Sequence, residues 1–155
     1  GISSDGGVPM GLSSFSYICI TNNPALKGLV KHLEYMDASS LDVLKKGRAL
    51  VHEGWELLAS PFYGNFKPNQ QPYRTLVLRK NNGGNGGLPD AQSLSLIEDS
   101  VRFYENSHWI MPPGRLADNI EKDFRYMDMI LLEETFRQYG ILTSPVKSYS
   151  EVVDK

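Results

Sequence analysis

The stretch "FSYICITNNP" (residues 15–24) sets the fold class that the rest of the chain then follows. Residues 15–20 are rich in aromatic and β-branched side chains, which is typical of a short buried strand. Asn23 can cap a helix, and Pro24 suits the first helical position. Apolar side chains within 26–30 then fall on one helical face. A strand followed directly by a helix is the building unit of α/β proteins.

The same alternation continues outward along the chain. Further strands are predicted over 33–37, 55–60 and 74–79, and further helices over 39–54, 89–106 and 115–140. This order predicts an α/β fold, a small Rossmann-like three-layer sandwich with a mostly parallel sheet of about four strands and a long C-terminal helix. The third and fourth strands are joined without an obvious helix, so one pair can be antiparallel.

Length and composition favour a single domain. The chain has 155 residues with a net charge of −2, which gives no electrostatic support for nucleic-acid binding. No apolar run approaches the roughly 18 residues of a membrane-spanning helix. We expect a disordered leader or expression remnant over 1–14, one α/β domain over 15–145 and a tail over 146–155. The lone cysteine, Cys19, lies in a predicted buried strand, and no secretory signal precedes it, which favours a cytoplasmic protein.

The glycine-rich stretch "NNGGNGG" (81–87) stands between a predicted strand and a predicted helix, where phosphate-binding loops occur. A P-loop requires a lysine and a serine or threonine after its glycines, whereas Leu88 and Pro89 follow here. A dinucleotide fingerprint requires a third glycine at the position that Pro89 occupies. Proline also lacks the N–H that a phosphate would accept. We therefore expect a surface loop.

Polar segments follow three of the predicted strands, and ligands of open α/β sheets collect at this carboxyl end. The third segment (60–73) has Lys67 as its only charge before Arg74 is reached, which suits a carboxylate or a phosphate. The candidate ligand-binding residues of the three segments are Thr21, Asn22 and Asn23, then Asp37 and Ser39, then Ser60, Tyr63, Asn65 and Lys67.

Each segment also has a purely structural interpretation. Asn22 and Asn23 can simply cap and turn the chain, and Asp37 can belong to a turn. The third segment can be an Ω-like loop that covers a sheet edge. No motif assigns a catalytic residue, a metal ligand or a cofactor. Trp109 and Ile110, which precede two prolines, are expected to anchor a chain reversal.

Three strings carry a family resemblance, namely "ITNNP" (20–24), "SSLDVL" (39–44) and "LVHEGWELLASPFYGNFKPNQQPY" (50–73). They resemble the GrdX-type family of small accessory proteins, encoded with glycine, sarcosine and betaine reductase systems of amino-acid-fermenting anaerobes. The likeness covers roughly 17–105. It implies a cytoplasmic protein without established catalytic activity, and an accessory or regulatory role near glycine reductase components. It brings no catalytic residues to this chain.

Three functional hypotheses remain. The first is a non-catalytic accessory or regulatory protein that binds a small anionic metabolite or a partner protein at the carboxyl edge of its sheet. The second is an enzyme that acts on a small phosphorylated or carboxylated substrate at the same edge. The third is a docking module whose apolar helix surface (116–139, with Met127, Met129 and Phe136) contacts a partner or forms a homodimer.

Overall fold

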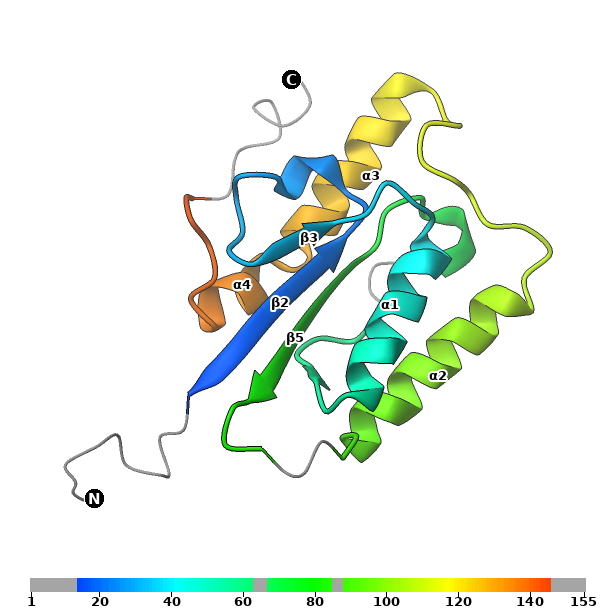
Figure 1. Cartoon of the computed structure of the whole chain (residues 1–155). Coiled ribbons are helices and arrows are strands. Elements are labelled where there is room, and N and C mark those ends of the chain that lie inside the picture. Colours follow the sequence, from blue (N-terminus) through cyan, green and yellow to red (C-terminus); the bar gives the residue numbers. More distant parts are fainter. Residues whose placement is uncertain (1–13, 63–66, 85–87, 146–155) are drawn as a thin grey trace.

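The computed structural model describes residues 14–62, 67–84 and 88–145, and shows a four-stranded sheet with helices on both faces (Figure 1). The strands are β2 (Phe15–Thr21), β3 (Leu33–Tyr35), β4 (Glu56–Leu57) and β5 (Thr75–Asn81). The helices are α1 (Ser40–His52), α2 (Ala91–Glu105), α3 (Asp118–Ile130) and α4 (Glu133–Gln138), with two 3₁₀ turns, η2 (Pro24–Leu26) and η3 (Pro68–Gln70). The prediction of a mixed α/β domain is confirmed.

The sheet is mixed, so the prediction of a mostly parallel sheet was wrong. Its order is β3-β2-β5-β4; β2 runs parallel to β3, whereas β5 runs antiparallel to both of its neighbours. The reason lies in the connection from β4 to β5, whose described residues, 58–62 and 67–74, contain the short turn η3 but no crossover helix of the kind that a parallel connection requires. The antiparallel alternative for the third and fourth strands is confirmed. Strand β5 lies between β2 and β4, and it pairs antiparallel with β2 as well.

Side chains alternate across the sheet and build a hydrophobic cluster on each face. Ile20, Leu76 and Leu78 point toward α1 and α2, and we call this side the first cluster. Cys19 and Val77 point the other way, toward η2, α3 and α4, and form the second cluster. The two central strands, β2 and β5, therefore supply both hydrophobic cores.

Local capping signals set the starts of the two longer helices that cover the first cluster. Ser39 and Asp42 form a reciprocal capping box at the start of α1. Asp90 accepts a hydrogen bond from the backbone N–H of Ser93 at the start of α2. Both helices begin within two residues of their predicted starts, because a capping pair lies within four consecutive residues.

Two predicted helices differ from the structure. The helix expected after Asn23 is only the three-residue turn η2, and Gly28 follows with a φ of 78°, which a helix does not tolerate. The predicted long C-terminal helix is broken into α3 and α4 at Leu131 and Leu132. This break leaves Leu131 exposed and buries Leu132 in the second cluster. Among the described residues, no helix is long and apolar enough to cross a bilayer.

Strand directions define the edge at which the candidate site was predicted. Since β4 is antiparallel to β5, and β5 to β2, the strands β2, β3 and β4 all end at one edge, where β5 begins. We call this the carboxyl edge. The connection between α2 and α3 (106–117) also returns to this edge, because Glu121 in the first turn of α3 accepts a hydrogen bond from Tyr73, just before β5.

Candidate functional site

Asn22 joins three separate segments at the carboxyl edge. Its Nδ2 donates to the carbonyl oxygens of Ala38 and Pro72, each at 2.9 Å. Its Oδ1 accepts the backbone N–H of Arg74 at 2.8 Å. The side chain is 2% exposed, so these bonds form away from water and fix the loops after β2 and β3 against the start of β5.

Asn23 connects the same edge to α3. Its Nδ2 donates to the carbonyl oxygen of Arg125 and to Oδ2 of Asp128, both at 2.9 Å. Its Oδ1 accepts the backbone N–H of Ala25, which is the capping role expected from the sequence. Asp128 Oδ2 also accepts the Thr75 hydroxyl at 2.6 Å, and the Thr21 hydroxyl lies 2.7 Å from that of Thr75. Thr21, Thr75, Asn23 and Asp128 are all buried.

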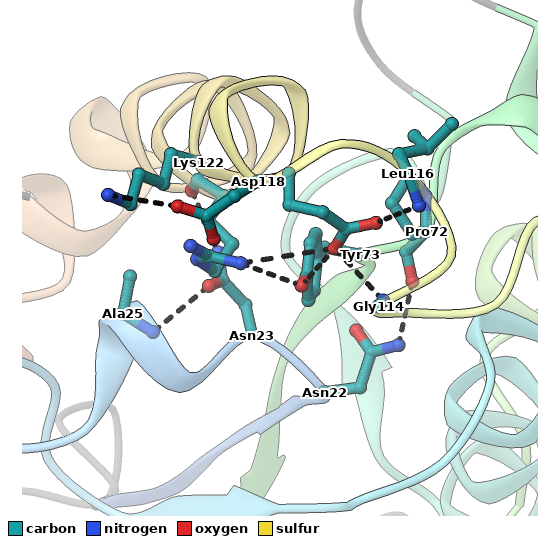
Figure 2. A network of polar contacts seen from close by, with 11 residues as sticks. Asn22, Asn23, Ala25, Pro72, Tyr73, Gly114, Leu116, Asp118 and Lys122 are labelled. Atoms are coloured by element: carbon teal, nitrogen blue, oxygen red, sulfur yellow. Dashed lines mark hydrogen bonds and ion pairs between the residues drawn. The ribbon is translucent and has the colours of Figure 1, made fainter. Parts of the chain in front are cut away.

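Glu121 is a buried carboxylate that holds the start of α3 in place. Its partners Tyr73, Gly114 and Leu116 are labelled in Figure 2. Its Oε1 accepts the Tyr73 hydroxyl at 2.6 Å and the backbone N–H of Gly114 at 3.0 Å. Its Oε2 accepts the backbone N–H of Leu116 at 3.1 Å. Burial, followed by the hydrogen bond to Glu121, raises the pKa of Tyr73 to about 12, although Arg125 nearby acts in the opposite direction.

On the other face of the sheet, the Arg74 guanidinium is fully buried. Its Nη2 donates to Gln71 Oε1 at 3.3 Å and to the Tyr104 hydroxyl at 3.2 Å. The Tyr104 hydroxyl in turn donates to the carbonyl oxygen of Pro68 at 2.7 Å. The guanidinium also lies 5.9 Å from the centre of the Phe62 ring. This contact brings the segment after β4 to the same edge, as the sequence predicted.

The other candidate residues are more accessible, and they do not converge. Asp37 is exposed beyond β3, and the Ser39 side chain is used in the cap of α1. Ser60 is exposed, and its hydroxyl accepts the backbone N–H of Phe62 at 3.2 Å. Lys67 is exposed at the start of η3. Tyr63 and Asn65 lie outside the described residues.

Sequence reasoning missed most of this network. Its omitted members are Tyr73, Arg74, Thr75, Tyr104, Glu121, Arg125 and Asp128. Arg74 stood at the end of a predicted strand, where an arginine is normally solvated, and the acids stood on a helix of mixed polarity. No local signal marks them, because their partners are distant in sequence; Asn23 and Asp128 are 105 positions apart.

The outer surface of the carboxyl edge is formed by two segments that contact each other, 67–72 and 106–117. The backbone N–H of Met111 donates to the carbonyl oxygen of Asn69 at 2.8 Å, and Asn69 Nδ2 donates to the carbonyl oxygen of Trp109 at 3.3 Å. We call these two segments the acid-free surface, because neither contains aspartate or glutamate. Its charged side chains are Lys67 and Arg115, both exposed, and neither forms an ion pair within the described residues.

The acid-free surface contains a cavity of about 370 Å³. Its lining is apolar apart from one guanidinium, and consists of Trp109, Ile110, Met111, Pro112 and Arg115. Of the two residues expected to anchor a chain reversal, Ile110 packs against the first cluster, whereas Trp109 is 48% exposed and lies at the surface. An apolar hollow with a single cation suits a ligand that combines an apolar body with one negative charge.

At the end of the sheet opposite the carboxyl edge, where β2 begins and β5 ends, the charged side chains are less accessible. A hollow of about 270 Å³ is lined by Phe15, Gly54, Glu56, Arg79, Asn81 and Asp90. Its cation is already engaged, since Arg79 Nε donates to Glu56 Oε1 at 3.0 Å and its guanidinium lies 4.3 Å from the Phe15 ring centre. Gly83 and Gly84 of the glycine-rich stretch are exposed at this edge, and 85–87 lie outside the described residues.

Cys19 is completely buried in the second cluster. Burial, and secondarily the charge of Asp128, raises the pKa of its thiol above the ordinary value. A thiol in this setting stays protonated, as expected for a structural cysteine. Groups of three or more histidine, cysteine or acidic side chains placed to hold a metal ion are absent from the part of the chain that the structure describes.

Comparison with known proteins gave one match. A family model described as "GrdX-like protein" matches residues 18–137. This range begins within β2 and ends within α4, and it contains all the buried polar groups described above. No curated protein and no solved structure matched the chain.

Proposed function

Because the chain belongs to the GrdX-like protein family, we propose that it is a non-catalytic accessory or regulatory protein that acts beside glycine, sarcosine or betaine reductase components. In this proposal it works in the cytoplasm and binds a small anionic metabolite at the carboxyl edge of its sheet. The metabolite carries one carboxylate or phosphate on an apolar body. It occupies the cavity lined by Trp109 and Arg115.

The observation that carries this proposal is the acid-free surface. Arg115 lines the cavity, Lys67 lies on the adjoining segment, and no acidic side chain of either segment competes with a bound anion. A cation that is not held in an ion pair attracts negative ligands more strongly than one that is already paired. The cavity floor is also fixed, since Glu121 binds the backbone at Gly114 and Leu116 on either side of Arg115.

The buried groups at the same edge support binding more than turnover. A general acid or base has to reach its substrate within hydrogen-bonding distance. Glu121 is 3% exposed and accepts three hydrogen bonds from its own chain, and Asp128 is 4% exposed. The hydrogen bonds of these two carboxylates join strands, loops and α3 into a rigid platform, on which the outer surface is displayed.

Fluorescence titration tests the site directly. In a Trp55→Phe background Trp109 is the only tryptophan, and its emission should change saturably with phenylacetate. Phenethylamine, which has the same ring but the opposite charge, should have no effect. Arg115→Gln should weaken phenylacetate binding about tenfold or more, since an ion pair is lost from a partly desolvated site.

Three further variants make the titration decisive. Arg102→Gln is the matched control, because Arg102 is an exposed arginine on α2 paired with Asp99, away from the cavity lining. Lys67→Ala should weaken binding less than Arg115→Gln, since Lys67 does not line the cavity. Asn22→Ala should lower the free energy of unfolding by about 2 kcal/mol or more, because it leaves buried donors and acceptors unpaired. Equal binding by wild type and Arg115→Gln would remove the cavity from the proposal.

The accessory role requires a separate experiment. The tagged chain, expressed in its native cells, should co-purify with reductase components, and its addition should alter their activity in an assay that contains no other change. Turnover of a phosphorylated or carboxylated compound by the purified chain alone would contradict the proposal, and would favour an enzyme that uses the same edge.

A further inference from the structure

The outer edge of β3 presents backbone groups that no other strand uses. Its inner side pairs with β2: Cys19 N–H donates to the His32 carbonyl at 3.1 Å, and Met36 N–H donates to the Thr21 carbonyl at 2.7 Å. Alternate residues of a strand face opposite sides, so the N–H and C=O groups of Leu33 and Tyr35 point away from β2. Within 14–62, 67–84 and 88–145, no hydrogen bond satisfies these four groups.

The outermost strand on the other side of the sheet, β4, is closed to further pairing. β4 has only two residues, and the backbone N–H of Leu57 donates to the Ser93 hydroxyl at 2.9 Å. A helix side chain therefore takes the place of a further strand there. Within the part of the chain that the structure describes, the edge formed by Leu33 and Tyr35 is therefore the better one for accepting another strand.

We propose that a second copy of this chain pairs with the outer edge of β3. Two copies related by a twofold axis perpendicular to the sheet place β3 antiparallel to itself. In the register centred on Glu34, Leu33 lies opposite Tyr35 of the second copy, and Tyr35 lies opposite its Leu33. The backbone groups of Leu33 and Tyr35 face outward in both copies, so each of the two pairs exchanges two hydrogen bonds. The two four-stranded sheets then form one continuous sheet.

Charge selects this register over its neighbours. The strand and its flanks read "KHLEYMD" (31–37), with a cation at one end and an anion at the other. Self-pairing centred on Glu34 places Lys31 opposite Asp37 of the second copy twice. Both side chains are exposed, and neither forms an ion pair within the described residues. The two copies of Glu34 face each other, but each already pairs with its own Lys46 at 3.6 Å.

Neighbouring features limit the contact to a short one. His32 has a φ of 56° and ends the extended backbone just before Leu33, so Lys31 reaches its partner by its side chain alone. The apolar residues of α3 and α4 do not compete for the second copy, because Met129 and Phe136 are buried in the second cluster. The expected dimer is therefore reversible, and it forms at β3 rather than at a helix. It does not involve the cavity residues of the proposed function, so either can fail without the other.

A cysteine on the twofold axis tests the geometry. Directly opposed residues that do not exchange hydrogen bonds have Cα atoms about 4.5 Å apart, which is within the range that a disulfide spans. Glu34→Cys should therefore form a covalent dimer under mild oxidation with oxidised glutathione, while Cys19 stays buried and unreactive. Glu53→Cys, exposed at the end of α1, is the matched control and should crosslink much more slowly.

Sedimentation velocity over a range of protein concentrations tests the register. The wild-type mass should rise with concentration, and Lys31→Glu or Asp37→Lys alone should weaken association by about tenfold, since two ion pairs become two repulsions. The double variant Lys31→Glu with Asp37→Lys should restore it. A subunit mass at every concentration, or equal crosslinking by Glu34→Cys and Glu53→Cys, would overturn the proposal and leave the edge to a different chain.

Discussion

At the scale of single residues, the carboxyl edge is organised by side chains whose partners are remote in sequence. The sequence analysis placed Asn22 in the segment after the first strand, and local context identified Asn23 as a helix cap. Their main contacts could not be predicted, because the carbonyl oxygen of Pro72 lies 50 positions from Asn22 and Asp128 lies 105 positions from Asn23. Asn23→Ala is now expected to destabilise the fold, whereas sequence alone left a ligand contact and a structural cap as alternatives.

Cys19 gives a prediction about the pH dependence of stability. Its folded pKa is raised, whereas the unfolded thiol ionises near pH 8.5. The stabilisation is therefore fully present below about pH 8.5, and it is lost as the pH rises because only the unfolded chain releases the proton. The free energy of unfolding should fall by up to about 1.4 kcal/mol per pH unit above that point.

Urea denaturation of wild type and Cys19→Ala between about pH 7 and about pH 9.5 checks this expectation. The variant is less stable throughout, because it loses buried volume, but its stability should fall less steeply above pH 8.5. Tyr73, whose pKa is raised to about 12, contributes only above about pH 10 and stays outside the window. Parallel profiles for the two proteins would show that Cys19 does not titrate on unfolding.

At the scale of elements, positions were predictable and directions were not. Apolar periodicity and caps lie within a few consecutive residues, so α1, α2 and the two long strands were found close to their observed bounds. The alternation of apolar and polar residues in a strand is the same in either direction. The direction is therefore decided by the segment that connects the strand to its neighbour. The mixed sheet therefore follows from the missing crossover helix between β4 and β5, and the break between α3 and α4 follows from burial of Leu132 and Phe136.

Helix α1 approaches the sheet closely at Gly47. A Cβ at this position would lie 2.4 Å from Leu76 Cδ1. Alanine improves helix propensity by about 1 kcal/mol, but overpacking a core costs about 1 to 3 kcal/mol. Leu76 is 1% exposed and has little room to move, so Gly47→Ala should lower the free energy of unfolding by about 1 kcal/mol.

A double-mutant cycle separates these two contributions. In a Leu76→Ala background the obstructing methyl group is absent, and Gly47→Ala should then stabilise the protein by up to about 1 kcal/mol through helix propensity alone. Thermal or urea unfolding of the four proteins measures the coupling. A destabilising effect of the same size in both backgrounds would place the strain somewhere other than Leu76.

At the scale of the whole molecule, β2 and β5 hold the two hydrophobic clusters together. A loss in one cluster should therefore be felt in the other. Phe136 is fully buried in the second cluster, and Phe136→Ala should cost about 3 to 5 kcal/mol. Trp55 packs against the first cluster, on the opposite face of the sheet.

Unfolding followed by two probes checks this coupling. In a Trp109→Phe background, Trp55 emission and far-ultraviolet circular dichroism should give the same midpoint, and Phe136→Ala should shift both equally. The proposed cavity does not contribute to this result, because the background removes its tryptophan from the signal. A Trp55 midpoint that stays at the wild-type value would mean that the two layers unfold separately.

The central position of β5 affects the chain while it is being synthesised. Ribosomes release the amino terminus first, so β2 emerges well before its longest partner; Thr21 and the paired Thr75 are 54 positions apart. Translation of that interval takes on the order of seconds, during which the apolar strand has only the short β3 beside it. Nascent chains that stall in this interval are the ones that chaperones should capture, and pause sites placed after α4 should be harmless.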